Sequence, residues 1–198
     1  MPTTTTLSPT PGMATEPGPI AGIVLAGGLS SRMGRDKALL PWHGRTLLEH
    51  ICGLLRQAGA NPLRVSGNYP ATNGIPDLLP QRGPLGGLHS VLATLHDGPA
   101  WVVPVDMPLL GPGLLRQLRD APAAPCVIFA GQPLPMRLQV DSACRNLLDA
   151  MLGDAAGPRS LHAMQQRLGG TLALPVTAAL ASCLSNCNTP AQWAELRP

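Results

Sequence analysis

The segment IAGIVLAGGLSSRMGRDKALL (residues 20–40) passes from an apolar run through two glycines into a stretch with three cations. The run at 20–26 has the length of a strand and no polar residue, which is typical of a strand buried on both faces of a parallel sheet. Because the glycines lack side chains, backbone N–H groups after the strand can approach an anion closely, and Arg32 and Lys37 can reach it from farther along. The stretch suits a di- or triphosphate; a tight turn with solvated cations is the alternative.

Apolar periodicity farther along predicts alternating strands and helices. Strands are expected at 62–67, 101–106, 126–130 and 134–140, and helices at 46–59, 87–98, 111–120, 142–152, 157–168 and 189–196. Thr46 and Glu49 have the spacing of a capping box. Thr189 and Gln192 repeat it, and Ser142 is the expected N-cap of its helix. The alternation predicts an α/β fold, a three-layer α/β/α sandwich around a Rossmann-like, mainly parallel sheet.

Length and composition limit the remaining possibilities. The chain has 198 residues, and we expect a single domain at 20–198 after a Thr- and Pro-rich tail at 1–19 that is disordered and carries no secretion signal. A net charge of +3, without interleaved aromatic and basic residues, argues against nucleic acid as a partner. No apolar stretch is long enough to cross a membrane. The five cysteines form no C-x-x-C pair, which indicates reduced thiols and a cytoplasmic location.

Three polar stretches follow the first three predicted strands: 26–37, Asn68 and Asp106. Ligands of parallel α/β sheets gather at the carboxyl ends of the strands, so these stretches are expected to share one edge. The proline at position 108 restricts the backbone just behind Asp106. A carboxylate in this place is a natural Mg²⁺ ligand; an aspartate that bonds its own turn is the alternative.

The glycine segment is neither a Walker A loop nor G-x-G-x-x-G, but its surroundings resemble a known family. LAGGLSSRMGRDKALLPWHGRTLLEH is similar to the signature L-A-G-G-x-S-x-R-M-G-x-D-K-x-L of the molybdenum cofactor guanylyltransferases, within the wider group of nucleotidyltransferases. Four further segments resemble family segments in family order: RGPLGGLHSVL, VDMPLL, QPLPMRL and NCNTPAQWAEL. The resemblance extends over residues 22–196.

The resemblance implies a nucleotidyl transfer. The terminal phosphate of molybdenum-molybdopterin would attack the α-phosphorus of GTP, pyrophosphate would leave, and a guanine dinucleotide form of the cofactor would result. Such a reaction needs alignment of its partners and cations opposite the developing charge. The implied catalytic residues are Lys37 as a point charge near the α-phosphate, Arg32 as a fork on the β and γ oxygens, and Asp106 as the ligand of Mg²⁺.

The resemblance also implies a nucleotide site, with contacts from Leu25, Ala26, Gly27, Gly28, Lys37, Asn68, Asp77 and Asp106. Asp77 is the candidate for base choice, because an ionised carboxylate can accept from both N1–H and the exocyclic amine of guanine. Its spacing to the glycine at position 83 is one residue shorter than in the family. Asn68 is matched to an Asn that holds the base or ribose. Relatives that use CTP typically carry Leu-Ala-Ala-Gly instead of Leu-Ala-Gly-Gly, so we expect GTP.

For the second substrate, the resemblance implies contacts from Asn186, Asn188 and Arg159, the last at the start of a predicted helix whose dipole favours a phosphate. Arg137 lies in a matched segment and is weighed equally against a solvated role. Recipient molybdoenzymes or other proteins of cofactor biosynthesis are the expected protein partners. The alternatives are a CTP-dependent cytidylyltransferase, a sugar-phosphate nucleotidyltransferase, and a non-catalytic cofactor carrier, against which the joint presence of Arg32, Lys37 and Asp106 argues.

Overall fold

The computed structural model describes residues 18–27, 36–189 and 192–194. The predicted tail therefore lies almost entirely outside the described residues, as do Gly28 and Arg32. That residues 20–198 form one domain stays a prediction.

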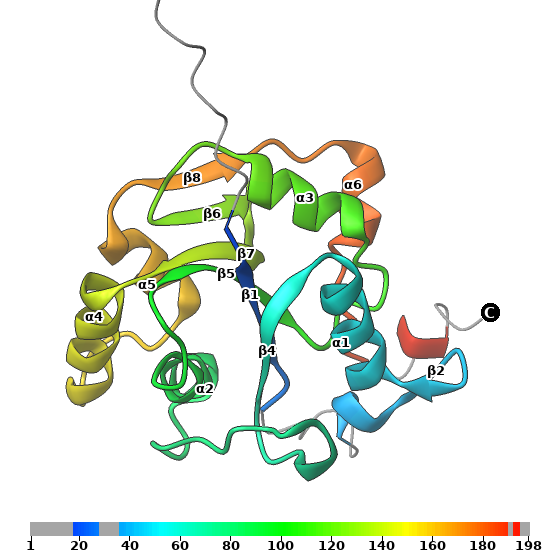
Figure 1. The fold of residues 1–198 in the computed structure, drawn as a ribbon, viewed down its shortest axis with the longest axis horizontal. Helices are drawn as coiled ribbons and strands as arrows, with labels where there is room; N and C mark the ends of the chain where they lie inside the picture. The colour runs from blue at the N-terminus through cyan, green and yellow to red at the C-terminus, as the bar shows by residue number, and fades with distance from the viewer. Residues whose placement is uncertain (1–17, 28–35, 190–191, 195–198) are drawn as a thin grey trace, which may run out of the picture.

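A six-stranded sheet runs through the middle of the molecule in the order β4-β1-β5-β7-β6-β8 (Figure 1). Its strands are β1 Ile20–Leu25, β4 Ala60–Ser66, β5 Gly98–Pro104, β6 Cys126–Phe129, β7 Gln132–Val140 and β8 Thr171–Leu174. Strand β1 pairs in parallel with β4 and β5, and β6 pairs in parallel with β8. Within this sheet, among the residues that the structure describes, β7 alone runs antiparallel to its neighbours, β5 and β6. The predicted mainly parallel sheet is confirmed.

Helices cover both faces of this sheet, which confirms the three layers (Figure 1). One face carries α1 Leu47–Gln57, α3 Pro112–Asp120 and α6 Ala178–Cys183; the other carries α2 Gly83–Leu92, α4 Ser142–Gly153 and α5 Leu161–Leu168. The structure also contains the 3-10 turns η1 Lys37–Leu39 and η2 Pro70–Thr72 and a small hairpin of β2 Pro41–Trp42 and β3 Arg45–Thr46.

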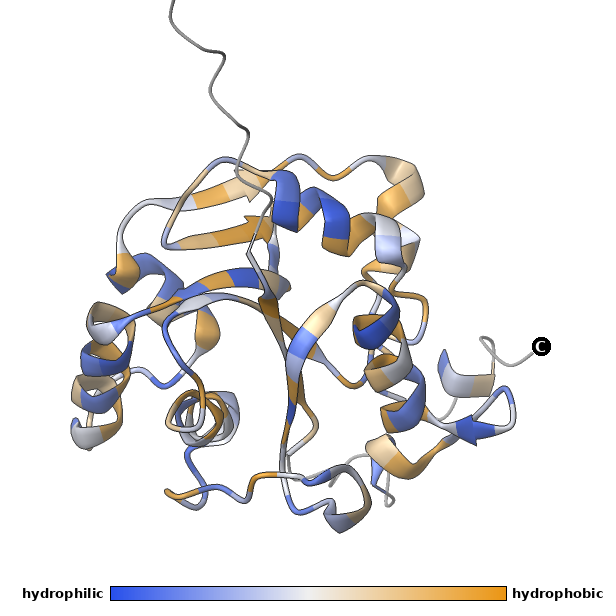
Figure 2. Cartoon of the chain, in the orientation of Figure 1, coloured by the Kyte–Doolittle hydropathy of each residue, from blue (hydrophilic) through white to orange (hydrophobic). Residues whose placement is uncertain are grey.

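Side chains from the two faces of the sheet pack into two separate hydrophobic cores. In β1, Val24 joins the core under α1 and α3, whereas Ile23 and Leu25 join the core under α2, α4 and α5. In β5, Trp101 and Val102 divide between the two cores in the same way. Figure 2 shows the consequence, with hydrophobic residues along the strands and hydrophilic ones on the outer sides of the helices. Burial on both faces is why these strands read as continuous apolar runs.

Two helix caps were predicted correctly and one was wrong. The Thr46 side chain accepts from the N–H of Glu49, and the Glu49 carboxylate accepts from the N–H of Thr46, so α1 begins with a capping box. The Gln192 N–H donates to the hydroxyl of Thr189 at 3.2 Å, as expected. In α4 the N-cap is Asp141 instead of Ser142, because the Asp141 carboxylate accepts from the N–H of Cys144 at 2.8 Å.

Several predicted boundaries were also wrong. Helix α2 begins at Gly83 and ends at Leu92, not at 87–98, because Pro84 favours the first turn and Gly98, at φ 145°, already opens β5. Strand β5 ends at Pro104, which leaves Asp106 in the turn beyond it. Strand β8 and helix α6 were not predicted, since both are short and only partly buried. No described helix has the length and hydropathy to cross a membrane.

Candidate active site

The carboxyl ends of β4, β1 and β5 are joined to one another by backbone hydrogen bonds. The N–H groups of Ala26 and Gly27 donate to the Ser66 carbonyl at 3.3 and 2.9 Å, and the N–H of Val105 donates to the Leu25 carbonyl at 3.1 Å. Ser66 thus accepts from both of these N–H groups, and the predicted binding of an anion by the backbone after β1 would fall to Gly28 and the residues beyond it, which lie outside the described residues. Gly27 still lines the cavity described below.

Lys37, Asp106 and Asn188 meet at this edge from three distant parts of the chain. The Lys37 Nζ atom lies 3.1 Å from Asp106 Oδ2 and 2.5 Å from Asn188 Oδ1. The side chains of Lys37 and Asp106 are 17% and 20% exposed, so the ion pair is shielded from solvent but reachable. The Lys37 ammonium therefore contacts two side-chain oxygens at once, one from Asp106 and one from Asn188.

The main chain explains how these residues come together. The Asp36 carboxylate caps η1 by accepting from the N–H of Ala38 at 3.0 Å, which fixes the turn that carries Lys37. The N–H of Cys187 donates to the Asp106 carbonyl at 2.8 Å, so the C-terminal segment lies along the turn after β5. Burial raises the pKa of the Cys187 thiol, which keeps this neighbour neutral.

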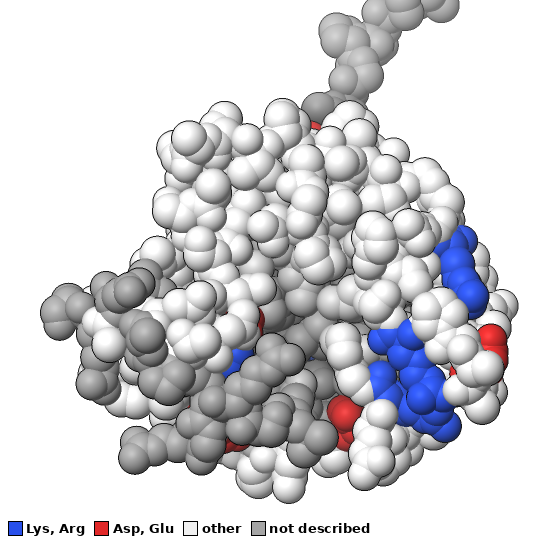
Figure 3. Space-filling view, turned by 180° about the vertical axis from the view of Figure 1, so that it is seen from behind, with Lys and Arg blue, Asp and Glu red and all other residues white. Residues whose placement is uncertain are grey.

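A cavity of about 750 Å³ lies at the same edge. It is lined by Gly27, Gly67, Asn68, Pro76, Asp77, Gln81, Gly83 and Pro84. In Figure 3 the charged side chains of the visible face gather in its lower half, around a recess, while the described residues of the upper half are almost entirely uncharged. Three of the eight lining residues of the cavity are glycines, which allow a ligand to approach the backbone closely, and Asp77 is the one charged residue among the eight.

Asp77 has unused hydrogen-bonding capacity in this cavity. Its Oδ1 atom is buried and has no hydrogen-bond partner among the described residues, and burial raises the pKa of the carboxyl. Such an atom is costly unless a ligand supplies a donor. The segment is held firmly, because the N–H of Leu78 donates to Ser90 Oγ at 2.8 Å. A side chain at Gly87 would lie 2.2 Å from Ser66 Oγ and 3.4 Å from Asp77 Oδ1, so a glycine is required beside this carboxylate.

The other predicted site residues are placed less centrally. Asn68 is exposed on the wall of the cavity, and Asn186 is exposed beside Asn188. Arg159 lies one residue before the Ser160 N-cap of α5, where its Nη2 donates to the carbonyls of 154 and 155 at 3.3 and 2.9 Å. No hydrogen bond among the described residues links Arg159 to Lys37 or Asp106, so its place in the site stays a prediction.

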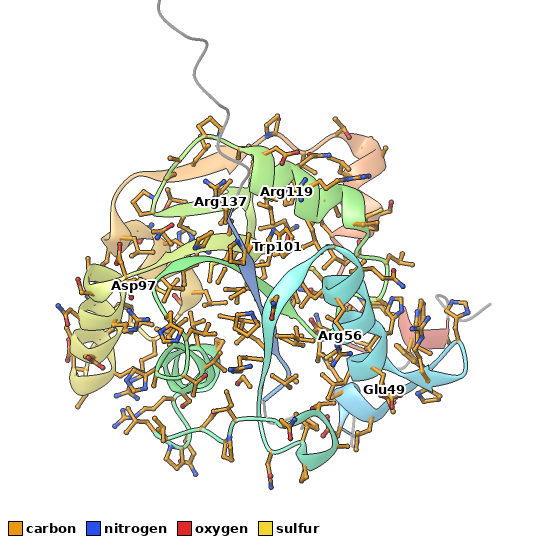
Figure 4. The ribbon with its side chains drawn as sticks, viewed as in Figure 1. Glu49, Arg56, Asp97, Trp101, Arg119 and Arg137 are labelled. Carbon is orange, nitrogen blue, oxygen red and sulfur yellow. The ribbon has the colours of Figure 1, made fainter. Side chains whose placement is uncertain are left out.

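Arg137 has a structural task. Its guanidinium donates to four carbonyls at the end of α3, those of Leu118, Arg119, Ala121 and Pro122. The residue is 8% exposed and lies with Arg119 beside α3 (Figure 4). A second cavity, of about 670 Å³, opens there at the amino-terminal edge of the sheet. A role for Arg137 at the pterin is therefore wrong, because its Nη1 and Nη2 groups bond backbone carbonyls at the opposite edge of the sheet.

Tyr69 and His50 are functional candidates that the sequence did not indicate. The Tyr69 hydroxyl contacts the Ala26 carbonyl and the Asp36 carboxylate. His50 Nε2 lies 3.0 Å from the Pro108 carbonyl, so α1 holds the turn that follows Asp106. The sequence signal for this region was Asp36, which belongs to the matched signature. Tyr69 lies outside every matched segment, and His50 is the last residue of the stretch quoted around the signature but has no counterpart in the signature itself. Within the described ranges no group of three or more His, Cys, Asp or Glu residues could hold a metal ion.

The fold and this edge define a nucleotidyltransferase, and comparison with known proteins identifies the family. Residues 22–169 match the MobA-like NTP transferase domain. The molybdenum cofactor guanylyltransferase of Xanthomonas euvesicatoria pv. vesicatoria is 52% identical over 90% of this chain and 94% of its own length. The enzyme of that name from Pseudomonas syringae pv. tomato is 30% identical over 87% and 90%. Molybdopterin-guanine dinucleotide biosynthesis protein A from Archaeoglobus fulgidus shares the fold, with a TM-score of 0.70, 20% identity and coverage of 89% and 96%. The chain belongs to the molybdenum cofactor guanylyltransferase family of MobA-like NTP transferases.

Proposed function

We propose that this enzyme transfers GMP from GTP to the terminal phosphate of molybdenum-molybdopterin, releasing pyrophosphate and forming the guanine dinucleotide form of the cofactor. The observation that carries the proposal is the contact of Lys37 with both Asp106 and Asn188 at the sheet edge. The relatives named molybdenum cofactor guanylyltransferase support the choice of substrates.

The proposed chemistry depends mainly on alignment and charge. Phosphoryl chemistry requires an attacking and a leaving oxygen in line, with cations opposite the charge that develops between them. Lys37 is the described cation that fits, because its ammonium is held in place by two side chains and remains partly exposed. The proposed contribution of Arg32 and Gly28 falls outside the described residues.

Mg²⁺ is the proposed cofactor, and the donor set at the edge suits it. The Asp106 carboxylate supplies hard oxygen ligands, and protein-bound Mg²⁺ is commonly held by one or two carboxylates together with substrate phosphates and water. Because Asp106 Oδ2 and Asn188 Oδ1 contact the Lys37 ammonium, the second carboxylate oxygen of Asp106 would be the one that holds Mg²⁺. A site of this kind needs no cluster of three protein carboxylates, in accord with the described residues. When bound, Mg²⁺ would offset the charge of the nucleotide phosphates.

For the nucleotide, Asp77 is the proposed reader of guanine. Guanine presents two adjacent donors, N1–H and the exocyclic amine, to a carboxylate, whereas cytosine presents the acceptor N3 in the corresponding place. The buried, unpartnered Oδ1 atom of Asp77 favours a ligand that brings donors. Asn68 and the segment from Leu25 to Gly27 would complete the described wall of the nucleotide site.

We also propose which residues contact the second substrate and which kind of protein receives the product. Asn186 and Asn188 lie next to the turn of Asp106 and would contact the phosphate of molybdopterin, with Arg159 as a further candidate. The product would pass to a recipient molybdoenzyme or to another protein of cofactor biosynthesis, in the cytoplasm. The described cysteines are all free, in accord with a reducing compartment.

The proposal is tested by incubating the purified protein with molybdenum-molybdopterin, MgCl₂ and one of GTP, CTP, ATP or UTP. We expect pyrophosphate and a guanine dinucleotide product with GTP alone. Turnover with CTP and not with GTP would contradict the base assignment and favour a cytidylyltransferase. If Asp106→Ala abolished delivery of the finished cofactor to an apoenzyme but left GMP transfer intact, the protein would be a carrier.

A further inference from the structure

Tyr69, the only tyrosine of the chain, ties together two segments that flank the glycine-rich stretch. Its hydroxyl lies 3.0 Å from the Ala26 carbonyl, and 3.1 and 3.0 Å from the two carboxylate oxygens of Asp36. Ala26 directly follows β1, and Asp36 directly precedes Lys37. One side chain from the turn after β4 therefore contacts the start and the end of the stretch that the family signature covers.

The turn that carries Tyr69 is rigidly built. The N–H of Gly67 donates to the Ile75 carbonyl at 2.8 Å, and the N–H of Gly74 donates to the Tyr69 carbonyl at 3.0 Å. A Cβ atom at Gly67 would lie 2.6 Å from the Tyr69 ring, and one at Gly74 would lie 2.4 Å from the Gly67 carbonyl oxygen. A side chain at either glycine would therefore displace the Tyr69 ring or its backbone, and with them the hydroxyl that contacts Ala26 and Asp36.

The same contacts lead from Tyr69 to the lysine of the site. The hydroxyl has one proton, which it donates to the Asp36 carboxylate or to the Ala26 carbonyl. Burial and the neighbouring Asp36 carboxylate raise the pKa of Tyr69, so the phenol stays protonated and able to donate. Asp36 in turn caps η1, the turn whose first residue is Lys37.

We propose that Tyr69 is a positioning residue of the GMP transfer proposed above: by holding Asp36 against Ala26, its hydroxyl places the Lys37 ammonium against Asp106 and Asn188. The inference rests on the proposed function for its reaction but on separate contacts for its argument. Among the described residues no hydrogen bond joins Tyr69 to Lys37, so Tyr69 acts through Asp36 and the cap of η1.

Tyr69→Phe is the primary test, because it removes the hydroxyl and keeps the ring on Gly67. We expect kcat for GMP transfer to fall about tenfold, the size of effect expected from losing a hydrogen bond to a charged group, while KM for GTP changes less than about twofold. The matched control is Thr72→Val, which removes a hydroxyl that donates to the Tyr69 carbonyl at 3.2 Å within the same turn. We expect Thr72→Val to keep kcat within about twofold.

A double-mutant cycle separates positioning from simple stability. If Tyr69 acts through Asp36, Asp36→Asn and the double variant Tyr69→Phe/Asp36→Asn should lose kcat to the same degree, instead of multiplying their separate losses. Multiplicative losses would overturn the inference. An unchanged kcat in Tyr69→Phe would also overturn it. So would a result in which Thr72→Val loses as much kcat and as much melting temperature as Tyr69→Phe does.

The wild-type enzyme distinguishes this failure from that of the proposed function. If wild type turns over GTP and Tyr69→Phe does so equally well, only the positioning role is wrong. If wild type uses CTP, ATP or UTP instead, the proposed substrate is wrong, and the same kcat comparison with that nucleotide decides the role of Tyr69. If calorimetry and turnover detect no nucleotide at all, both conclusions fail.

Discussion

The two edges of the sheet hold cavities of similar size and opposite character. The cavity at the carboxyl edge measures about 750 Å³ and the one at the amino edge about 670 Å³. At the amino edge the Arg137 guanidinium donates hydrogen bonds to four backbone carbonyls. At the carboxyl edge Asp77 keeps a buried oxygen that has no partner among the described residues, and the described partners of the Lys37 ammonium are two side chains, not backbone carbonyls. The two cavities differ less in volume than in whether the polar groups beside them already have protein hydrogen-bond partners. The cavity whose polar groups can still bond a ligand is the better candidate for a binding site.

The largest effect should come from Lys37→Ala at the carboxyl edge. Removing a cation that stabilises the charge of the transition state should lower kcat about 1000-fold, or about 4 kcal/mol. The melting temperature should change little, because the side chain packs into neither core. Steady-state kinetics and a thermal melt measure both quantities.

The matched control for Lys37→Ala is Arg119→Ala, which removes a cation that lines the amino-edge cavity and pairs with Asp120. We expect kcat within about twofold of wild type. A large loss of kcat in Arg119→Ala would mean that the amino edge takes part in the reaction. A collapse of the melting temperature in Lys37→Ala would mean that the Lys37 contacts serve folding.

Arg137→Met should show the opposite behaviour. The substitution keeps an unbranched apolar stem but leaves four carbonyls at the end of α3 without their donor. We expect the free energy of unfolding to fall by about 3 kcal/mol, while kcat per folded molecule stays within about twofold. Urea unfolding with active-site titration measures both. A loss of kcat without a loss of stability would return Arg137 to the pterin side.

The sequence predicted the layers and most of the edge, because both depend on local patterns. Continuous apolar runs such as 20–25 occur where a strand is buried twice, and their carboxyl ends must share an edge. Lys37, Asp106 and Asn188 could be proposed together from matched motifs, although 69 and 151 positions separate Lys37 from the other two. Short elements with partial burial, such as β8, carry too few apolar positions to show a period.

The sequence could not predict which partner each polar group bonds in the folded protein. Arg137 and Lys37 are both cations in matched segments, and only the structure shows that one is saturated by carbonyls and the other is not. The backbone after β1 was expected to bind an anion, and the structure shows that its first two N–H groups, those of Ala26 and Gly27, bond to Ser66 instead. Tyr69 acts across a turn whose shape depends on glycines, which no periodicity reveals.

A smaller effect is expected for Asp77→Asn, which keeps the shape of the side chain and exchanges one acceptor for a donor. We expect kcat/KM for GTP to fall about 30-fold, or about 2 kcal/mol, because a guanine donor would then face an amide N–H. Stability should stay level or rise slightly, since a buried carboxylate with a raised pKa is replaced by a neutral group.

Asp97→Asn is the control for Asp77→Asn, because Asp97 is 66% exposed and pairs with Arg145 just before β5, near α4 (Figure 4). We expect its kcat/KM for GTP within about twofold of wild type. If Asp77→Asn loses activity equally with every nucleoside triphosphate, the residue contributes to the fold of the edge and does not read the base.

The smallest effect is expected at the contact of His50 with the Pro108 carbonyl, in the turn after Asp106, whose contribution to stability should depend on pH. Burial lowers the pKa of His50 below its ordinary value of 6.5, and the ring nitrogen Nδ1 is buried without a partner among the described residues. The unfolded chain therefore binds a proton at higher pH than the folded protein does. The stability that neutral His50 contributes is present above pH 6.5 and is lost as the pH falls through the folded pKa.

His50→Gln tests this, because a glutamine amide can still donate to the Pro108 carbonyl but does not titrate between pH 7 and 5. Urea unfolding of wild type and His50→Gln at several pH values should give curves that converge as the pH falls below 6.5, with wild type losing more stability. Parallel curves would mean that the ring reaches water on protonation at no cost. In that case the contact of α1 with the turn after Asp106 would be insensitive to charge, and the carboxyl edge would owe its stability to the backbone bonds between strand ends.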